Sequence, residues 1–222
     1  VFISEEAQNL FTRVREDERN TQLNEVADIP VGLQTSADDI FIIQQGNDPT
    51  VTRADDGTEV IRFTKKGASW EIDSEITRFA LYDAILEPYR QPEGNAWMIF
   101  PYAVENGTAT LYTEQEMQDR FPRTWKYLNH FKDQLDPEQD EVGRTSVRGG
   151  DEKWYQYGRR QSLTKFDGSE KLVWSTLATQ TPYTYDGRGL VFTGGGNGPY
   201  YQLRPKEASK IDLPGAEQEY SI

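Results

Sequence analysis

The 222-residue sequence contains no cysteine and only one histidine, His130. Without cysteine the chain can form neither a disulfide nor a thiolate metal site. A single imidazole excludes sites that need two, and it weakens the case for a Ser-His-Asp triad. The sequence also lacks a D-x-D-x-D-G loop, an HExxH pair, a GxSxG turn and any Pro-Asp pair that could start a nuclease motif. We therefore find no reaction centre in these residues, and we interpret His130 as a partly buried helix residue.

Long hydrophobic runs are missing as well. No apolar stretch approaches the roughly 18 residues that a membrane-spanning helix requires, and residues 1–20 are too charged for a signal peptide. We expect no membrane partner and a cytoplasmic location. The chain begins at Val1 rather than methionine, so we expect a processed or excised piece of a longer protein. Its length suits one large domain or two small ones.

Positive charge is scarce over the first part of the chain. The sequence carries 37 acidic and 24 basic side chains, for a net charge of −13, which taken as a whole argues against a polyanionic partner. Residues 142–206, however, hold ten basic and five acidic side chains. An acidic, lysine-poor surface is also typical of a salt-loving organism, in which molar salt shortens the Debye length to ~3 Å; we state that origin as a hypothesis.

The first half of the chain alternates helical and strand patterns. Residues 4–19 show apolar positions at helical spacing behind a Ser4 cap, which predicts an amphipathic helix. Further along, the pattern predicts a short helix or turn leading to a strand at 23–29, a buried strand at 40–43, a polar hairpin at 46–60 turning at Asp56-Gly57, strands at 60–63 and 70–72, and a short helix or extended element at 77–86.

The middle of the chain predicts a hairpin followed by helices. Residues 97–112 read as two strands around an Asn106-Gly107 turn. Thr113 and Glu116 have capping-box spacing, and Pro122 is expected to split the following helix in two. In the second helix Trp125, Leu128 and Phe131 fall on one face.

Residues 154–205 concentrate aromatic side chains, arginines and a glycine cluster (Gly194, Gly195, Gly196 and Gly198). We predict strands joined by tight loops. Two interpretations stay open for this stretch. Aromatic rings and arginines beside a flexible loop suit a flat, charged partner such as nucleic acid, whereas a plain β-meander would use the tyrosines to cover a core. The GGGNG loop lacks the lysine of a phosphate-binding P-loop, so a hairpin is its simpler explanation.

Several phrases in order resemble the target-recognition domains of DNA adenine methyltransferases and single-chain restriction–modification enzymes of the TaqI type. The opening LNEVADIPVGLQTSADDIFII is similar to a family pattern filled here by Ile29, Gly32, Thr35, Phe41 and Ile43. IFPYAVENG, FPRTWKYLNHFKDQL, WYQYGRRQSL, KLVWSTLA and YTYDGRGLVFTGGGNGPYYQL resemble the later strands, helix and loop. The likeness extends over about residues 20–205.

The resemblance implies a connecting helix at 1–19, a DNA target-recognition domain at 20–205 and a polar tail at 206–222. It implies an α+β fold with a twisted, mostly antiparallel sheet and helices packed on one side. No Asn-Pro-Pro sequence occurs in the chain, so the catalytic methyltransferase domain and its S-adenosylmethionine would lie upstream, and this fragment would hold no cofactor and no metal. Whether a nuclease belongs to the same parent chain stays open.

Double-stranded DNA is the partner that follows from the resemblance. Arginine and glutamine side chains can read guanine and adenine edges, and basic side chains at a helix start can meet phosphates. The predicted base or phosphate contacts are Gln34 and Thr35 in a first loop, Arg159, Arg160 and Gln161 in a second loop, and Arg188 and Asn197 near a third loop. Arg123 and Lys126 are predicted to position the DNA backbone. Two other classes remain as alternatives: a carbohydrate- or protein-binding module with an aromatic platform at 154–201, and a carboxylate enzyme, which the missing motifs disfavour.

Overall fold

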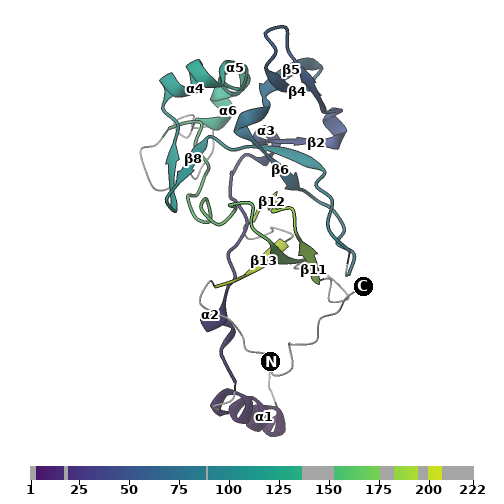
Figure 1. Ribbon diagram of the computed structural model, residues 1–222, viewed down its shortest axis with the longest axis vertical. Coiled ribbons are helices and arrows are strands. Elements are labelled where there is room, and N and C mark those ends of the chain that lie inside the picture. The colour runs from purple at the N-terminus through teal and green to yellow at the C-terminus, as the bar shows by residue number, and fades with distance from the viewer. Residues whose placement is uncertain are drawn as a thin grey trace, which may run out of the picture. The chain divides into compact units, whose positions relative to one another are not determined.

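A computed structural model of the chain describes residues 4–17, 20–88, 90–136, 153–175, 183–194 and 200–206 (Figure 1). The chain divides into two compact units, Val1–Ile29 with Leu203–Ile222, and Pro30–Gln202. The predicted boundaries at 19/20 and 205/206 therefore stay predictions. Within the described residues, no helix is long and apolar enough to cross a membrane.

The first unit contains the predicted N-terminal helix. Helix α1 (Glu5–Glu16) begins at Ser4, whose hydroxyl accepts a hydrogen bond from the Ala7 amide at 3.3 Å. Its apolar stripe, which includes Leu10 and Phe11, is exposed. Helix α2 (Leu23–Val26) leads directly into β1 (Ala27–Asp28), which confirms the short helix and strand predicted at 23–29. Strand β1 pairs antiparallel with the last residues of β13 (Tyr200–Pro205), in the register Ala27 to Pro205.

The second unit consists of short strands with helices inserted between them. Its strands are β2 (Ile42–Gln44), β3 (Thr50–Arg53), β4 (Glu59–Lys65), β5 (Ala68–Asp73), β6 (Thr77–Leu81), β7 (Ala96–Ile99), β8 (Tyr102–Glu105), β9 (Thr108–Leu111), β10 (Lys171–Ser175), β11 (Tyr183–Asp186), β12 (Val191–Phe192) and the start of β13. Its helices are α3 (Asp38–Phe41), α4 (Glu114–Arg120), α5 (Pro122–His130) and α6 (Lys132–Leu135), with 3₁₀ turns η1 (Gln45–Asn47) and η2 (Ser74–Ile76).

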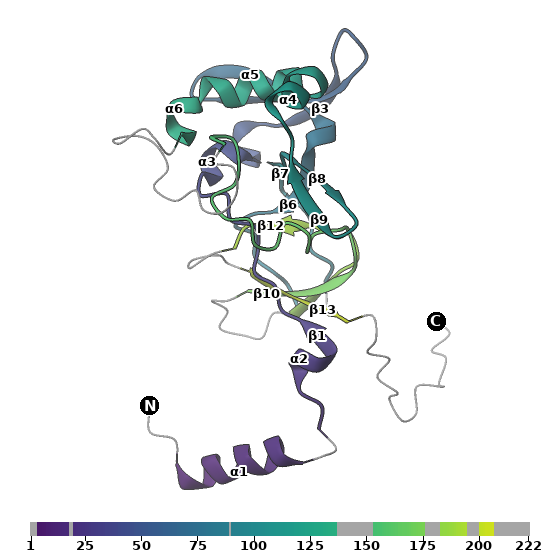
Figure 2. The ribbon, with the colours of Figure 1, turned by 90° about the vertical axis from the view of Figure 1, so that its left-hand side faces the viewer.

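The strands form several small sheets. Within the second unit their orders are β3-β4-β5, β8-β9, β12-β6-β7-β2 and β10-β11. Strands β12 and β6 run parallel, and the other pairs whose register is described are antiparallel. The α+β class with mainly antiparallel pairing is thereby confirmed. Helices α4 and α5 lie beside the β3-β4-β5 sheet in both views (Figures 1 and 2), and α5 packs on β5.

The turns predicted from sequence form as expected. Gly57 takes a left-handed conformation (φ 83°) in the β3–β4 hairpin, and Asn106 and Gly107 (φ 51° and 74°) turn β8 into β9. Thr113 and Glu116 make both hydrogen bonds of the capping box at the start of α4, and α5 begins at Pro122. Each of these signals acts through residues close together in the sequence, so the structure that it predicts depends little on tertiary packing.

Two predicted strands turn out differently. Residues Ile40 and Phe41 belong to the one-turn helix α3, and only Ile42 and Ile43 are in β2. A short apolar run is compatible with either conformation, and here tertiary packing decides. The segment Trp154–Leu163, also predicted as a strand, is a series of turns with one isolated bridge at Arg159.

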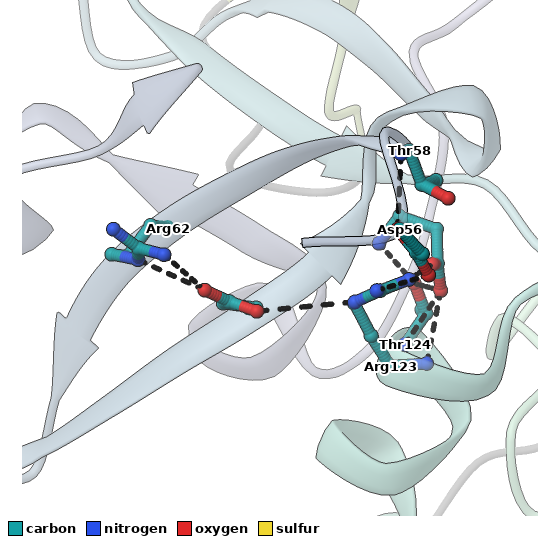
Figure 3. A network of polar contacts seen from close by, with 7 residues as sticks. Asp56, Thr58, Arg62, Arg123 and Thr124 are labelled. Carbon is teal, nitrogen blue, oxygen red and sulfur yellow. Dashed lines mark hydrogen bonds and ion pairs between the residues drawn. The ribbon is translucent and has the colours of Figure 1, made fainter. Parts of the chain in front are cut away.

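A buried carboxylate fixes the start of α5. The Asp73 side chain, from the end of β5, accepts hydrogen bonds from the backbone N–H groups of Arg123 and Thr124 at 3.1 and 2.9 Å (Figure 3). It also accepts from the Thr124 hydroxyl at 3.1 Å, while that hydroxyl oxygen accepts from the Asp73 amide at 2.9 Å. Asp73 thus caps the helix from a distant strand, in the place that a local Ser or Asp usually takes.

Replacing Asp73 with alanine should lower the free energy of unfolding by about 3 kcal/mol, because it leaves two helix N–H groups and the neighbouring Arg123 without their buried acceptor. Chemical denaturation measures the change. Asp55→Ala is the matched control, since Asp55 is exposed in the β3–β4 turn. Equal stability of the two variants would contradict the capping role.

Candidate nucleic-acid interface

The segment Val31–Thr35, which includes Gln34 and Thr35 of the predicted first contact loop, is held on one side by the chain around β12. The Leu33 amide donates to the Phe192 carbonyl at 2.9 Å, and the Gly194 amide donates to the Leu33 carbonyl at 2.8 Å. Gly32 lies directly against this partner: a Cβ built on Gly32 would be 2.4 Å from the carbonyl carbon of Thr193. Glycine is required here by close backbone approach.

The other side of the same segment carries the predicted second contact loop. The Gly158 amide donates to the Thr35 carbonyl at 3.0 Å, and the Arg159 amide donates to the Gln34 carbonyl at 3.2 Å. Gln34 and Arg159 therefore face each other in an isolated antiparallel bridge. Two predicted contact residues 125 positions apart in sequence are thereby brought together.

Buried tyrosines anchor the second loop. The Tyr157 hydroxyl donates to the Ile99 carbonyl at 2.5 Å, and the Tyr157 amide donates to the Tyr102 hydroxyl at 2.7 Å. Burial raises the pKa of Tyr157 well above its usual value. The Tyr155 hydroxyl donates to the Tyr112 carbonyl at 2.8 Å, and burial raises its pKa to about 12. Both hydroxyls therefore stay protonated donors near neutral pH, and they fix the backbone that presents Arg159.

The burial of these rings corrects the prediction of an aromatic platform over 154–201. Trp154, Tyr155 and Tyr157 lie in the core, as do Phe166, Phe192 and Tyr200. This part of the stretch follows the simpler interpretation, in which tyrosines cover a core. Exposed rings remain on one face of β10, β11 and β13, where Trp174 stacks on Tyr201 (5.7 Å, 28°) and lies beside Tyr183.

Thr35 does not reach the surface. It is fully buried, and its hydroxyl donates to the Asp38 carboxylate and accepts from the Ala37 amide. Burial raises the pKa of Asp38 from its ordinary value, although the hydrogen bond from Thr35 opposes the shift, and the negative charge of Asp83 adds to it. The predicted DNA contact at Thr35 is corrected to an internal role: it shapes the loop that carries Gln34.

Arg123 also has an internal role instead of the predicted phosphate contact. Its guanidinium lies 2.6 Å from Asp56, 3.4 Å from Asp73 and 3.8 Å from Glu71 (Figure 3). The hydrogen bond from Arg123 lowers the pKa of Asp56 to about 2. Because three carboxylates surround it, this guanidinium is already paired and is not available to a DNA phosphate. Lys126 is exposed on the same helix, and its contact with phosphate stays a prediction.

Arg188 is presented by a loop that a buried ion pair stabilises. The Asp186 carboxylate lies 2.8 Å from the Lys171 ammonium, with both side chains almost fully buried, and it accepts from the amides of Arg188 and Leu190 at 2.9 and 2.8 Å. Gly189 (φ 67°) packs on the backbone of Gly168. The Arg188 side chain itself is exposed.

Arg188 borders a cavity of about 540 Å³ that also contains Arg78. Its lining includes the rings of Phe79, Phe100 and Phe166 together with Asp167 and several aliphatic residues. The guanidinium of Arg78 lies over the Phe100 ring, 5.2 Å from its centroid, and Phe100 in turn contacts Tyr157. The sequence analysis missed Arg78, because an isolated arginine in a predicted helix or strand carries no signal of its own.

The remaining predicted residues are distributed as follows. Gln161 is exposed beside Arg159. Arg160 turns toward the β8–β9 hairpin, where it donates to the Ala109 carbonyl at 3.3 Å. Asn197 and most of the glycine cluster (195–199) lie outside the described residues; of that cluster, Gly194 is described and packs on Gly32.

The arginines of the chain differ in whether they form an ion pair. Arg62, Arg90, Arg120 and Arg123 are each paired with a carboxylate. Across the part of the chain that the structure describes, no ion pair involves the exposed guanidinium groups of Arg78, Arg159, Arg160 or Arg188. The described residues also contain no cluster of three or more histidines and carboxylates that could hold a metal ion. The site offers cationic and amide donors.

Comparison with known proteins places this site in context. No family model matches the sequence. Over 174 residues, or 76% of the chain, it is 24% identical to the type II restriction enzyme and methyltransferase RM.Eco57I of Escherichia coli. The match covers 16% of that enzyme's length. The chain is thus similar to part of a restriction–modification enzyme, which agrees in outline with the family resemblance; the finer likeness to the TaqI type stays a prediction.

Gly32→Ala should lower the free energy of unfolding by about 2–3 kcal/mol, because the added methyl group overlaps the Thr193 backbone and forces the two segments apart. Urea denaturation measures the loss. The control is Gly46→Ala, where a Cβ meets nothing within 4 Å. If Gly32→Ala is as stable as the control, the two segments are not in contact.

Asp38 should make the protein less stable as pH rises. Because burial raises its pKa in the folded state, the folded protein holds this proton more tightly than the unfolded chain does. The free energy of unfolding should fall as pH increases from about 4 through the raised pKa. Asp38→Asn should remove this fall, whereas Asp55→Asn should leave it in place. Parallel pH profiles for wild type and Asp38→Asn would refute the assignment.

Proposed function

We propose that this chain recognises a DNA sequence for a restriction–modification adenine methyltransferase. The catalytic domain and its S-adenosylmethionine would belong to another part of a longer protein. The observation that carries the proposal is the bridge between Gln34 and Arg159 at the segment Val31–Thr35, where the Arg159 side chain is exposed and forms no ion pair among the described residues. The similarity to RM.Eco57I over most of the chain adds support.

The chemistry of the exposed side chains fits a DNA groove. Arg159 and Gln34 are adjacent, and arginine and glutamine are the side chains that make paired hydrogen bonds with guanine and adenine. Arg188 and Arg78 add two further cations, which line one cavity. A protein of net charge −13 repels DNA over most of its surface, so local unpaired cations would confine the contact to one face. The polar base readers and cations then act together.

The three predicted loops are accounted for in this proposal with a reduced set of residues. Gln34, Arg159, Arg160, Gln161 and Arg188 remain as base or phosphate contacts, and Arg78 joins them. Lys126 and Asn197 are kept as predictions, while Thr35 and Arg123 serve the structure from within. A glycan- or protein-binding role would have to use the exposed rings of β10, β11 and β13 instead, and a binding screen with glycans and duplex DNA separates the two.

Arg159→Ala should weaken binding to the preferred DNA duplex about 5- to 150-fold, since a paired hydrogen bond with a base is worth ~1–3 kcal/mol. Fluorescence anisotropy with a randomised duplex pool, followed by selected sequences, provides the measurement at fixed salt. Arg62→Ala is the matched control: Arg62 is an exposed arginine paired with Glu71 at 2.5 Å.

The control should bind as wild type does. If Arg159→Ala and Arg62→Ala lose affinity equally, the contact is general charge attraction and not recognition. If wild type binds glycans and no duplex, the proposed function is wrong.

A further inference from the structure

A second, smaller cavity lies between the β8–β9 hairpin and the segment that leads to Arg159. Its volume is about 180 Å³, and its lining includes Thr110, Tyr112, Lys153, Tyr155, Gln156 and Arg160. It is distinct from the cavity that contains Arg78 and Arg188, which shares none of these residues. The volume suits a group of a few heavy atoms.

Gln156 is the unexplained group of this cavity. Its side chain is only 3% exposed, and its Nε2 has no hydrogen-bond partner. A buried amide donor without an acceptor is costly, and native proteins keep few of them unless a ligand or a function uses them. Rotation about the last side-chain bond exchanges the amide nitrogen and oxygen, so the donor can turn toward a group bound in the cavity.

Two cations border the same cavity. Arg160 uses one N–H on the Ala109 carbonyl, which leaves most of its fork of donors for another acceptor. The Lys153 ammonium lies 4.0 Å from Glu114, and both side chains are about half exposed, so this pair is weak and replaceable. The Tyr155 hydroxyl is already used as a donor to Tyr112. The cavity therefore presents donor groups from Gln156, Arg160 and Lys153, while the carboxylates of Glu114 and Glu116 contact its lining residues Lys153 and Thr113.

We infer that this cavity binds a phosphate-type anion, held by the Gln156 amide together with Arg160 and Lys153. A tetrahedral oxyanion can accept hydrogen bonds from all three of these side chains, and arginine pairs well with it through two parallel hydrogen bonds. The inference changes the role of Arg160 from base reading to phosphate binding. It rests on the proposed function only for the source of the anion, which is then a phosphodiester of the DNA backbone adjacent to the contact of Arg159.

The side-chain amide signals of glutamine test this inference directly. In ¹⁵N-correlated NMR spectra of the wild-type chain, the Gln156 NH₂ signals should shift saturably when duplex DNA is added. Inorganic phosphate is the second probe. Gln202 is an internal control, because it is fully buried with its amide also unpartnered and does not line the cavity; its signals should stay in place.

Two matched variants extend the test. Gln156→Leu removes the unpartnered donor, so it should weaken binding of the shifting probe about fivefold or more while leaving the melting temperature unchanged or raised by about 3 °C. Gln202→Leu should raise stability similarly and leave binding unchanged. A drop in stability for Gln156→Leu with binding intact would mean that the amide serves the fold, which overturns the inference.

The outcomes separate this cavity from the proposed function. A shift with duplex DNA alone identifies the phosphodiester, and a shift with inorganic phosphate identifies a small phosphate ligand; both support an anion site. If Gln156 stays still with both probes, or moves together with Gln202, the anion site is wrong. Should Arg159→Ala still lose DNA affinity in that case, the proposed function stands without the cavity. If phosphate binds to the cavity and the chain does not bind DNA, the anion site stands and the proposed function is wrong.

Discussion

The candidate surface depends on one short backbone segment that is hydrogen-bonded on both sides. Residues 31–35 exchange hydrogen bonds with the chain near β12 on one side and with Gly158 and Arg159 on the other. The first contact requires glycine at position 32, where no Cβ fits. The second requires a fixed backbone at Arg159, which the buried Tyr157 supplies through its hydrogen bond to Ile99. Without these hydrogen bonds, Gln34 and Arg159 would not lie side by side.

Charge is sorted by the same architecture. The acidic side chains are matched to cations where structure needs them, as at Arg123 among three carboxylates and at the buried Lys171–Asp186 pair. Removing one member of such a pair leaves an uncompensated charge, so these cations are tied to the fold. Among the described residues, Arg159 and Arg188 form no ion pair that the fold requires. An acidic protein can in this way keep a local cationic face.

Local sequence signals predicted the fold well where the chemistry is local. The Thr113–Glu116 capping box, the break at Pro122 and the Asn106-Gly107 turn each form as expected. The sequence misled where burial decides. Ile40 and Phe41 read as a strand but form a helical turn, and the Trp154–Leu163 segment forms turns whose aromatic rings go into the core. Periodicity cannot register the partners that a short apolar run will meet.

The candidate site was predictable in part for the same reason. Residue type alone selected Arg159 and Gln34, and the structure places them side by side. Residue type also selected Arg123 and Thr35, whose partners Asp56, Asp73 and Asp38 come from elsewhere in the fold or loop and occupy them. Whether a polar side chain is free depends on tertiary neighbours, which no motif encodes.

Hydrogen–deuterium exchange of the chain with and without its preferred DNA duplex tests the central claim most directly. The account predicts slower exchange on DNA binding in the amides of residues 31–35 and 158–161. Exchange in the β3–β4 hairpin, whose Asp56 pairs with Arg123 of α5, should not change. The account would be contradicted if protection were confined to the amides of that hairpin or of β10 and β11, with residues 31–35 and 158–161 unaffected.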